Sequence, residues 1–288
     1  MIDWGLETGI AVSLLIVLVL LVRRPFARMF GAGATYALWA LPLVRLFLPE
    51  ITIPVFKENV PNILTNIALS ETIQPSLAVT KPVADISEGF NIGLGFAVMW
   101  VAIGIIWFTY QILRQSAFMS RLRLETQTAP QRLQPEINKA MATLNLRRCP
   151  DIRLSKDNMG PIITGVIKPI IILPHNFCED YTLAQQHFAL VHEFAHIKRF
   201  DLWAAFVVLM FRAVNWPNPL VHYAAHKFRV DQEAACDSFV LSKIKGGSTA
   251  TQSYAETLVH AAKLGKSQKL SVPLSLALAQ QNEDKNDD

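Results

Sequence analysis

The sequence predicts an α+β membrane protein, in which three N-terminal helices precede a smaller domain of short strands and helices. Of its 288 residues, 51% are hydrophobic and 17% are charged, a balance that is unusual for a soluble protein of this size. The apolar residues are concentrated in long runs at residues 4–22, 31–48 and 92–113. From residue 120 to residue 199 the composition is that of a small soluble domain.

Each apolar run is long enough to cross a hydrocarbon core of about 30 Å as a helix. The first run does not resemble a cleavable signal peptide, because acidic residues precede it and Arg23, Arg24 and Arg28 follow it. The positive-inside rule places these arginines in the cytoplasm and the N-terminus outside. Residues 49–90 then form an acidic external loop, and the third helix returns inward to Arg114. The sequence therefore predicts a multi-pass protein of the inner (plasma) membrane.

The chain divides into a membrane region (residues 1–114), a cytoplasmic domain (115–265) and a C-terminal tail (266–288). The net charge of +4 follows largely from the basic flanks of the helices and from the cytoplasmic part. No basic run is interleaved with aromatic residues, so direct nucleic-acid binding is not expected. The three cysteines have no C-x-x-C spacing and lie on the reducing side, which predicts free thiols.

The cytoplasmic part begins with a predicted short helix over residues 135–146 and a strand over residues 151–154. Residues 160–174 are rich in β-branched side chains interrupted by glycine and proline, which predicts two short strands or a bent hairpin. Prolines confine this segment to the edge of a sheet. The edge is a candidate for binding an extended peptide, and a hairpin that only supports its neighbours is an equal alternative. The candidate positions are Ile162, Ile163, Thr164 and Gly165.

His192, Glu193 and His196 form an HExxH motif within a strongly helical segment. Histidines four residues apart project from one face of a helix, so both imidazoles can reach one ion. The intervening glutamate lies beside that ion, where it can accept a proton from metal-bound water. Thr182 and Gln185 fit a capping box, which predicts that the helix begins near Thr182. The motif predicts a Zn²⁺ site, and an amphipathic helix carrying two histidines by chance is the alternative.

A third protein ligand is available in a second helical stretch that begins after Pro219. Glu233 and Asp237 lie four residues apart and share a face of this helix. Glu233 is the predicted third ligand, and Asp237 is predicted to hydrogen-bond a ligand histidine. Cys236 is nearby, but a small buried side chain is its predicted role.

The apolar residues 202–216 separate the HExxH motif from Glu233. Because the three ligands must meet at one ion, a single membrane crossing between them is excluded. The segment is also short for a span, so it is predicted to enter and return, to lie along the interface, or to pack on the other helices. Asp201 is a candidate cap of the helix that follows, and residues 215–219 are the predicted turn.

His222 and His226 are candidates for donating a hydrogen bond to the oxyanion of a reaction intermediate. His226 lies seven residues before Glu233 and therefore roughly on the same helix face. The alternative for each is an ordinary surface histidine.

The chain resembles the BlaR/MecR-type membrane metallopeptidases, which are antirepressors that regulate drug resistance. The resemblance rests on residues 165–174, the HEFAHIKRFD sequence at residues 192–201, the Asn-Pro-Leu at 218–220 and the EAACD sequence at 233–237. It implies a zincin-like metalloprotease domain of the gluzincin type. In that domain His192, His196 and Glu233 hold zinc, Glu193 is the catalytic base and Asp237 supports the site. The resemblance does not extend to a penicillin-binding sensor domain: either the chain is truncated before that domain, or it belongs to the family members that lack it.

Three functions are compatible with these features. The first is an integral membrane zinc metalloendopeptidase that cleaves itself or a cytosolic transcriptional repressor in signal transduction. The second is a Ste24/HtpX-like quality-control protease, although that group places two full membrane helices where this chain has only residues 197–232. The third is a non-catalytic membrane scaffold, against which the complete set of ligands argues.

Overall fold

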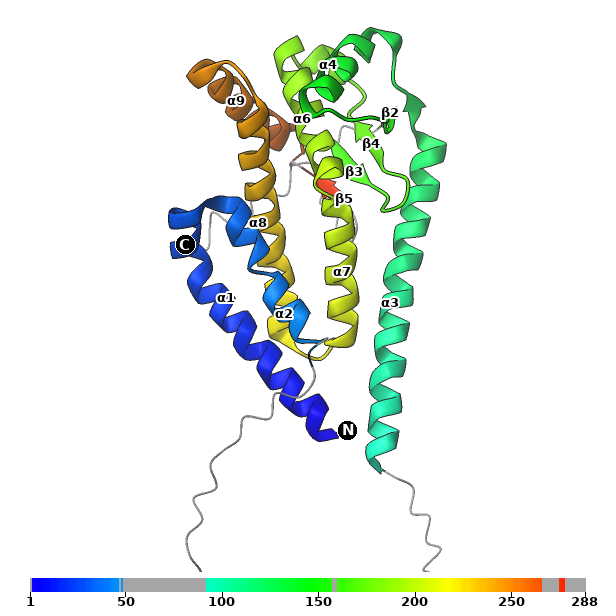
Figure 1. The fold of residues 1–288 in the computed structure, drawn as a ribbon. Helices are drawn as coiled ribbons and strands as arrows, with labels where there is room; N and C mark the ends of the chain where they lie inside the picture. Colours follow the sequence, from blue (N-terminus) through cyan, green and yellow to red (C-terminus); the bar gives the residue numbers. More distant parts are fainter. Residues whose placement is uncertain (1, 47, 49–91, 157–159, 266–274, 278–288) are drawn as a thin grey trace, which may run out of the picture.

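The computed structural model describes residues 2–46, 48, 92–156, 160–265 and 275–277 (Figure 1). Long helices extend from a smaller group of helices and strands, and the HExxH motif lies in that group. The predicted external loop at 49–90 and most of the C-terminal tail lie outside the described residues. The elements in chain order are α1 (Ile2–Ala37), α2 (Ala40–Arg45), α3 (Ile92–Glu125), β1 (Gln127–Thr128), a 3₁₀ turn (Gln131–Leu133), α4 (Gln134–Leu144), β2 (Asp151–Leu154), β3 (Ile162–Thr164), β4 (Ile170–Leu173), α5 (Phe177–Asp180), α6 (Leu183–Lys198), α7 (Asp201–Val214), α8 (Pro219–Lys243), α9 (Gly247–Gly265) and β5 (Ser275–Ala277).

Among the residues that the structure describes, two stretches of helix are long and apolar enough to cross a membrane, residues 7–45 and 93–125. The prediction of three separate membrane helices is therefore not confirmed. Helix α1 continues past its arginines to Ala37 and bends at Gly31, where φ is 82°. Arginine is a good helix former, so the basic residues end the apolar run without ending the helix. For the same reason α3 continues to Glu125, beyond the predicted end at residue 113.

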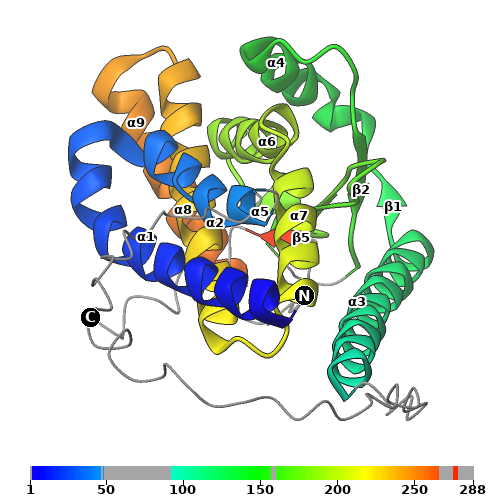
Figure 2. The same cartoon turned by 60° about the horizontal axis from the view of Figure 1, so that its bottom comes forward.

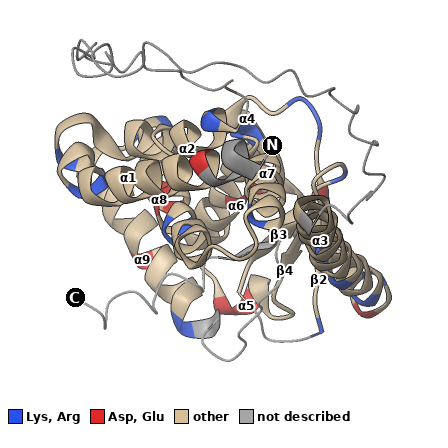
Figure 3. Ribbon diagram, turned by 90° about the horizontal axis from the view of Figure 1, so that it is seen from below, with Lys and Arg blue, Asp and Glu red and all other residues tan. Residues whose placement is uncertain are grey.

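Helices α7 and α8 form a helical hairpin: α7 runs down between α1 and α3, and α8 runs back up (Figure 1). At Gly104 of α3, an added Cβ would lie 2.7 Å from the backbone oxygen of Ala213, so only glycine permits this approach of α7. Trp100 Nε1 also donates a hydrogen bond to the oxygen of Val214 at 2.9 Å. The apolar segment forms the single helix α7, which packs against α3 and α8, one of the three arrangements predicted for residues 202–216. Viewed from the end where α1 and α3 begin, most of the ribbon of these helices is tan, with scattered charged residues (Figure 3).

The strands form one sheet in the order β1-β2-β4-β3-β5. The predicted strand at residues 151–154 and the predicted hairpin are both confirmed, since β3 and β4 pair antiparallel. Gly165 begins the hairpin turn with φ 91°, where an added Cβ would lie 2.6 Å from the oxygen of Lys168. The prediction that Ile162 to Thr164 form an open edge is corrected, because β5 pairs antiparallel with all three residues. The sequence pattern missed β5 because it is only three residues long.

Helix α6 lies at the centre of this group, with α4 on one side and α8 and α9 on the other (Figure 2). Its residues from Gln186 to His196 are all buried. Leu190, Val191 and Phe194 belong to the main hydrophobic core together with side chains of α4, the sheet and α9. Because the HExxH motif is buried on every side, close packing holds its side chains rigidly.

Candidate metal centre

The first turn of α6 fixes the register of the histidines. Thr182 Oγ1 accepts a hydrogen bond from the Gln185 nitrogen at 3.3 Å, and Gln185 Oε1 accepts one from the Thr182 nitrogen at 3.0 Å. The predicted capping box is thus confirmed. Ten and fourteen residues after Thr182, His192 and His196 lie one turn apart, with their Nε2 atoms 3.1 Å from each other.

Glu233 of α8 reaches the same point from the opposite side. Its Oε2 lies 3.5 Å from the Nε2 atoms of both His192 and His196. Two ligand atoms on a tetrahedral zinc ion are separated by about 3.3 Å, given bond lengths of about 2.0–2.1 Å. The three observed separations bracket that value, so the residues present fit a tetrahedral metal ion with one position left for another ligand.

His196 is held from behind by Asp201. The Nδ1 of His196 lies 2.8 Å from Asp201 Oδ2, and Asp201 is fully buried. Because a carboxylate only accepts, Nδ1 carries the proton and the lone pair of Nε2 faces Glu233. The prediction that Asp201 caps α7 is corrected: the N-cap is Phe200, without a side-chain cap bond. The carboxylate of Asp201 instead accepts from His196 and from Arg199 Nε at 3.1 Å.

His192 is held from behind by Tyr254 and Asp237. Its Nδ1 lies 2.8 Å from the Tyr254 hydroxyl oxygen and 3.2 Å from Asp237 Oδ1. Tyr254 donates its own hydrogen to Asp237 at 2.7 Å, so its oxygen is available to accept from His192. The sequence pointed to Asp237 but not to Tyr254. The only local signal was an aromatic residue in an apolar helical pattern, which looks the same as a core residue.

Glu193 lies in the same buried region but is not tied down. It is 1% exposed, and neither carboxylate oxygen has a hydrogen-bond partner among the described residues. Burial raises the pKa of Glu193 to about 7, against the opposing effect of the two neighbouring histidines. A buried carboxylate without a partner is costly, and a group brought in by the site, such as water, would relieve that cost.

The electrostatics of Glu233 differ from those of Glu193. Burial alone would raise its pKa, but His196 and His192 hold the pKa of Glu233 well below its usual value. Glu233 is therefore the carboxylate of the pair that remains ionised, as a metal ligand requires.

Cys236 offers a second choice of ligand set. His192, His196 and Cys236 each present one ligand atom within 4.8 Å of the others, and Cys236 is fully buried. Its Sγ contacts the backbone oxygen of His192 at 3.8 Å. All three cysteines are free thiols, as predicted. The site thus holds two imidazoles and two candidates for the third ligand.

The two remaining histidine candidates, His222 and His226, lie at different distances from Glu233 along α8. His222 lies at the turn between α7 and α8, where its ring nitrogens contact Arg212 at 3.2 Å and the Trp216 oxygen at 2.9 Å. It precedes Glu233 by about 16 Å along the helix axis, so the structure does not bring it to the site. His226 precedes Glu233 by about 10 Å, and its role as a donor stays a prediction.

Known proteins are similar to this chain over much of its length. A family model described as BlaR1 peptidase M56 matches residues 5–284. The chain is 25% identical over 252 residues to Regulatory protein BlaR1 of Staphylococcus aureus, covering 84% of this chain and 43% of that protein. It is 34% identical over 85 residues to Regulatory protein BlaR1 of Bacillus licheniformis, covering 30% of this chain and 14% of that protein. It is 24% identical over 245 residues to the Methicillin resistance mecR1 protein of Staphylococcus aureus (strain Mu50), covering 79% of this chain and 41% of that protein.

The chain spans less than half the length of each of these relatives. The family model, in contrast, covers nearly the whole chain, including both candidate membrane spans and the metal centre. The resemblance inferred from the sequence is confirmed, and the chain belongs to the BlaR1 peptidase M56 family.

Proposed function

We propose that this chain is an integral membrane zinc metalloendopeptidase with His192, His196 and Glu233 as zinc ligands and Glu193 as the catalytic base. The observation that carries the proposal is the convergence of three ligand atoms at separations of 3.1, 3.5 and 3.5 Å. Membership of a peptidase family whose relatives are regulatory proteins supports a membrane signal-transducing protease. The direct test is to measure zinc per chain and peptide hydrolysis in the purified full-length protein.

His192, His196 and Glu233 would hold the zinc ion, which would supply Lewis-acid activation of a water molecule and of the carbonyl of the scissile bond. The remaining steps belong to the chain. Glu193, with no hydrogen-bond partner among the described residues, accepts the proton of the attacking water and delivers it to the leaving amine. Asp201 orients the ring of His196, and Tyr254 with Asp237 orients the ring of His192. These contacts keep both Nε2 lone pairs directed at one point.

Replacing Asp201 with asparagine is expected to weaken zinc binding by about 10- to 100-fold, because the charged acceptor behind His196 is lost. Zinc affinity is measured by competition with a chelator of known affinity. Asp151→Asn is the matched control, since Asp151 is exposed and its carboxylate forms an ion pair with Arg153 at the sheet, away from the metal centre. An unchanged zinc affinity in Asp201→Asn would contradict the role given to this carboxylate.

We propose that the substrate binds as an extended strand along β3, in the place that β5 takes. Strand β3 contacts α6, and β5 pairs with it through Ile162, Ile163 and Thr164. Strand β5 thus shows how an extended segment can add to β3 as an antiparallel strand, next to the helix that carries the HExxH motif. This arrangement fits a protease that acts on itself as well as on another protein, such as a cytosolic repressor.

If β5 competes with substrate, Leu276→Pro is expected to increase hydrolysis of an added peptide, mainly through a lower KM. Proline cannot donate to a strand ladder, so the substitution weakens the pairing with β3. Steady-state kinetics with a peptide substrate measure the change. An unaltered or higher KM would argue against a substrate position on β3.

We also propose that the metal centre lies on the cytoplasmic side. The C-terminal part of α3, with Arg114, Arg121 and Arg123, lies beside the sheet, and the half of α1 that follows Arg23 is directed towards the same end of the molecule (Figure 1). The positive-inside rule assigns such basic segments to the cytoplasm. Cys149 is exposed on this part of the molecule. In intact cells it is expected to resist a membrane-impermeant maleimide and to react after permeabilisation. Labelling of Cys149 in intact cells would reverse the proposed orientation.

A further inference from the structure

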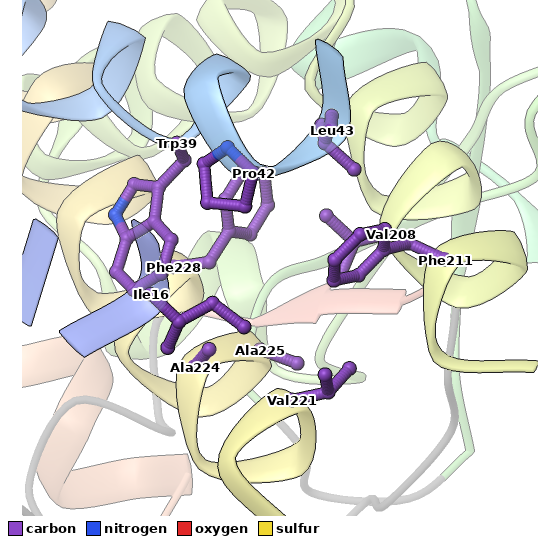
Figure 4. A pocket seen from close by; sticks show the side chains of 10 residues that line it. All are labelled: Ile16, Trp39, Pro42, Leu43, Val208, Phe211, Val221, Ala224, Ala225 and Phe228. Carbon is purple, nitrogen blue, oxygen red and sulfur yellow. The ribbon is translucent and has the colours of Figure 1, made fainter. Parts of the chain in front are cut away.

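The N-terminal hairpin, defined here as α1 and α2, packs closely along α7 and α8 (Figures 1 and 4). The pocket between the two hairpins has a volume of only ≈ 20 Å³, room for about one water molecule. Close packing transmits a displacement of one surface to the other. The pocket is lined by Ile16, Trp39, Pro42 and Leu43 from the N-terminal hairpin and by Val208, Phe211, Val221, Ala224, Ala225 and Phe228 from α7 and α8.

Polar contacts fix this hairpin to the two residues that precede Glu233. Asp231 is 9% exposed, and its carboxylate accepts from Arg23 Nη1 at 3.1 Å and from Trp39 Nε1 at 2.8 Å. The next residue, Gln232, is fully buried and donates from Nε2 to the hydroxyl of Tyr36 at 3.0 Å. The chain immediately before the third candidate ligand is therefore held by the N-terminal hairpin.

The same amide connects to the support of His196. Gln232 Nε2 also donates to the backbone oxygen of Asp201 at 3.0 Å. Its two N–H groups thus bridge Tyr36 and Asp201. The contact with Asp201 is buried and the contact with Tyr36 is partly buried, and an unpaired donor on the fully buried Gln232 is costly. If Tyr36 or Asp201 no longer accepts its hydrogen bond, one N–H group of the Gln232 amide loses its partner and the side chain is no longer held in this orientation.

Tyr36 reaches Asp201 by a second route. The guanidinium of Arg199 lies over the Tyr36 ring, 5.3 Å from its centroid, and the same guanidinium donates to Asp201. The ring also packs against Phe228 of α8, with centroids 5.2 Å apart. One side chain of the N-terminal hairpin therefore contacts both the helix that carries Glu233 and the residues that hold His196.

We infer that Tyr36 is a positioning residue of the metal centre, through which the N-terminal hairpin sets the placement of Glu233 and His196 by way of Gln232. This inference rests on the proposed metal-dependent function. The Tyr36 hydroxyl holds the Gln232 amide, and that amide ties the start of α7 to α8. A displacement of the hairpin relative to α8 moves the two halves of the metal centre relative to one another. The membrane helices are thereby part of the site rather than only its anchor.

Tyr36→Phe tests this inference because it removes only the hydroxyl and keeps the ring contacts. In the full-length protein in lipid nanodiscs, we expect zinc binding about 10-fold weaker and kcat lower by about 10- to 100-fold, with KM nearly unchanged. Tyr223→Phe is the matched control, since Tyr223 is an exposed tyrosine of α8. The visible spectrum of the cobalt-substituted protein adds a readout of ligand geometry, and it should shift in Tyr36→Phe but not in the control.

A double-mutant cycle separates positioning from a general loss of stability. Gln232→Met keeps the length of the side chain without its hydrogen bonds, and its effect should not add to that of Tyr36→Phe. The inference is overturned if Tyr36→Phe matches the wild type in zinc affinity, spectrum and kcat, or if the two effects are additive. A wild-type protein that neither binds zinc nor cleaves peptides would instead refute the proposed function, so the two failures are distinguishable.

Discussion

Glu193→Ala is expected to reduce peptide hydrolysis by about 1,000-fold while the protein still binds zinc, because a positioned general base contributes about 100- to 10,000-fold. Glu193 supports no other residue, since its oxygens have no hydrogen-bond partner among the described residues. Its removal therefore affects the proton transfer and not the ligands. The measurement is kcat for a peptide substrate, together with zinc per chain by metal analysis.

Glu193→Gln should show the same loss, because the amide has the same shape and cannot accept the proton. Glu256→Ala serves as the control, since Glu256 is an exposed glutamate of α9 whose carboxylate accepts a hydrogen bond from Gln252. Hydrolysis that persists in both Glu193 variants would exclude this carboxylate as the base. Loss of zinc in Glu193→Ala would instead make it a ligand.

Glu233→Gln is expected to weaken zinc binding by more than about 100-fold, whereas Cys236→Ala should retain zinc. The contrast arises because Glu233 Oε2 lies 3.5 Å from both Nε2 atoms, while Cys236 Sγ contacts the backbone of His192. A lost direct ligand should cost more than a lost supporting contact, which is worth about 10- to 100-fold. Chelator competition measures both variants under the same conditions.

Cys236→Ala also removes a buried side chain, so its folding is checked by circular dichroism and thermal unfolding before the zinc affinity is compared. If Cys236→Ala loses zinc and Glu233→Gln keeps it, the ligand set is two histidines and a cysteine. The gluzincin assignment would then be wrong, although a metal centre would remain.

The local features of the fold were largely predictable from the sequence. The capping box at Thr182, the strand at residues 151–154 and the turn after α7 depend on residues close together in the chain. The position of Glu233 near the two histidines could also be predicted, because the spacing of a metal-binding motif restricts where a third ligand can lie. These predictions needed only helical periodicity and the chemistry of zinc ligands.

The contacts between distant segments were not predictable in this way. Tyr254 supports His192 from a helix more than fifty residues further on, and Tyr36 reaches Gln232 from the opposite end of the chain. Neither side chain differs in its local pattern from a core aromatic residue. The role of Asp201 was mistaken for the same reason, because an acidic residue at a helix start fits a cap until its distance to His196 is known.

X-ray absorption at the zinc edge of the purified protein tests the central claim most directly. We expect an ion bound by two imidazole nitrogens and carboxylate or water oxygens at about 2.0–2.2 Å, with no sulfur in its coordination shell. A zinc–sulfur distance of about 2.3 Å, which would identify Cys236 as a ligand, or the absence of bound zinc would contradict it.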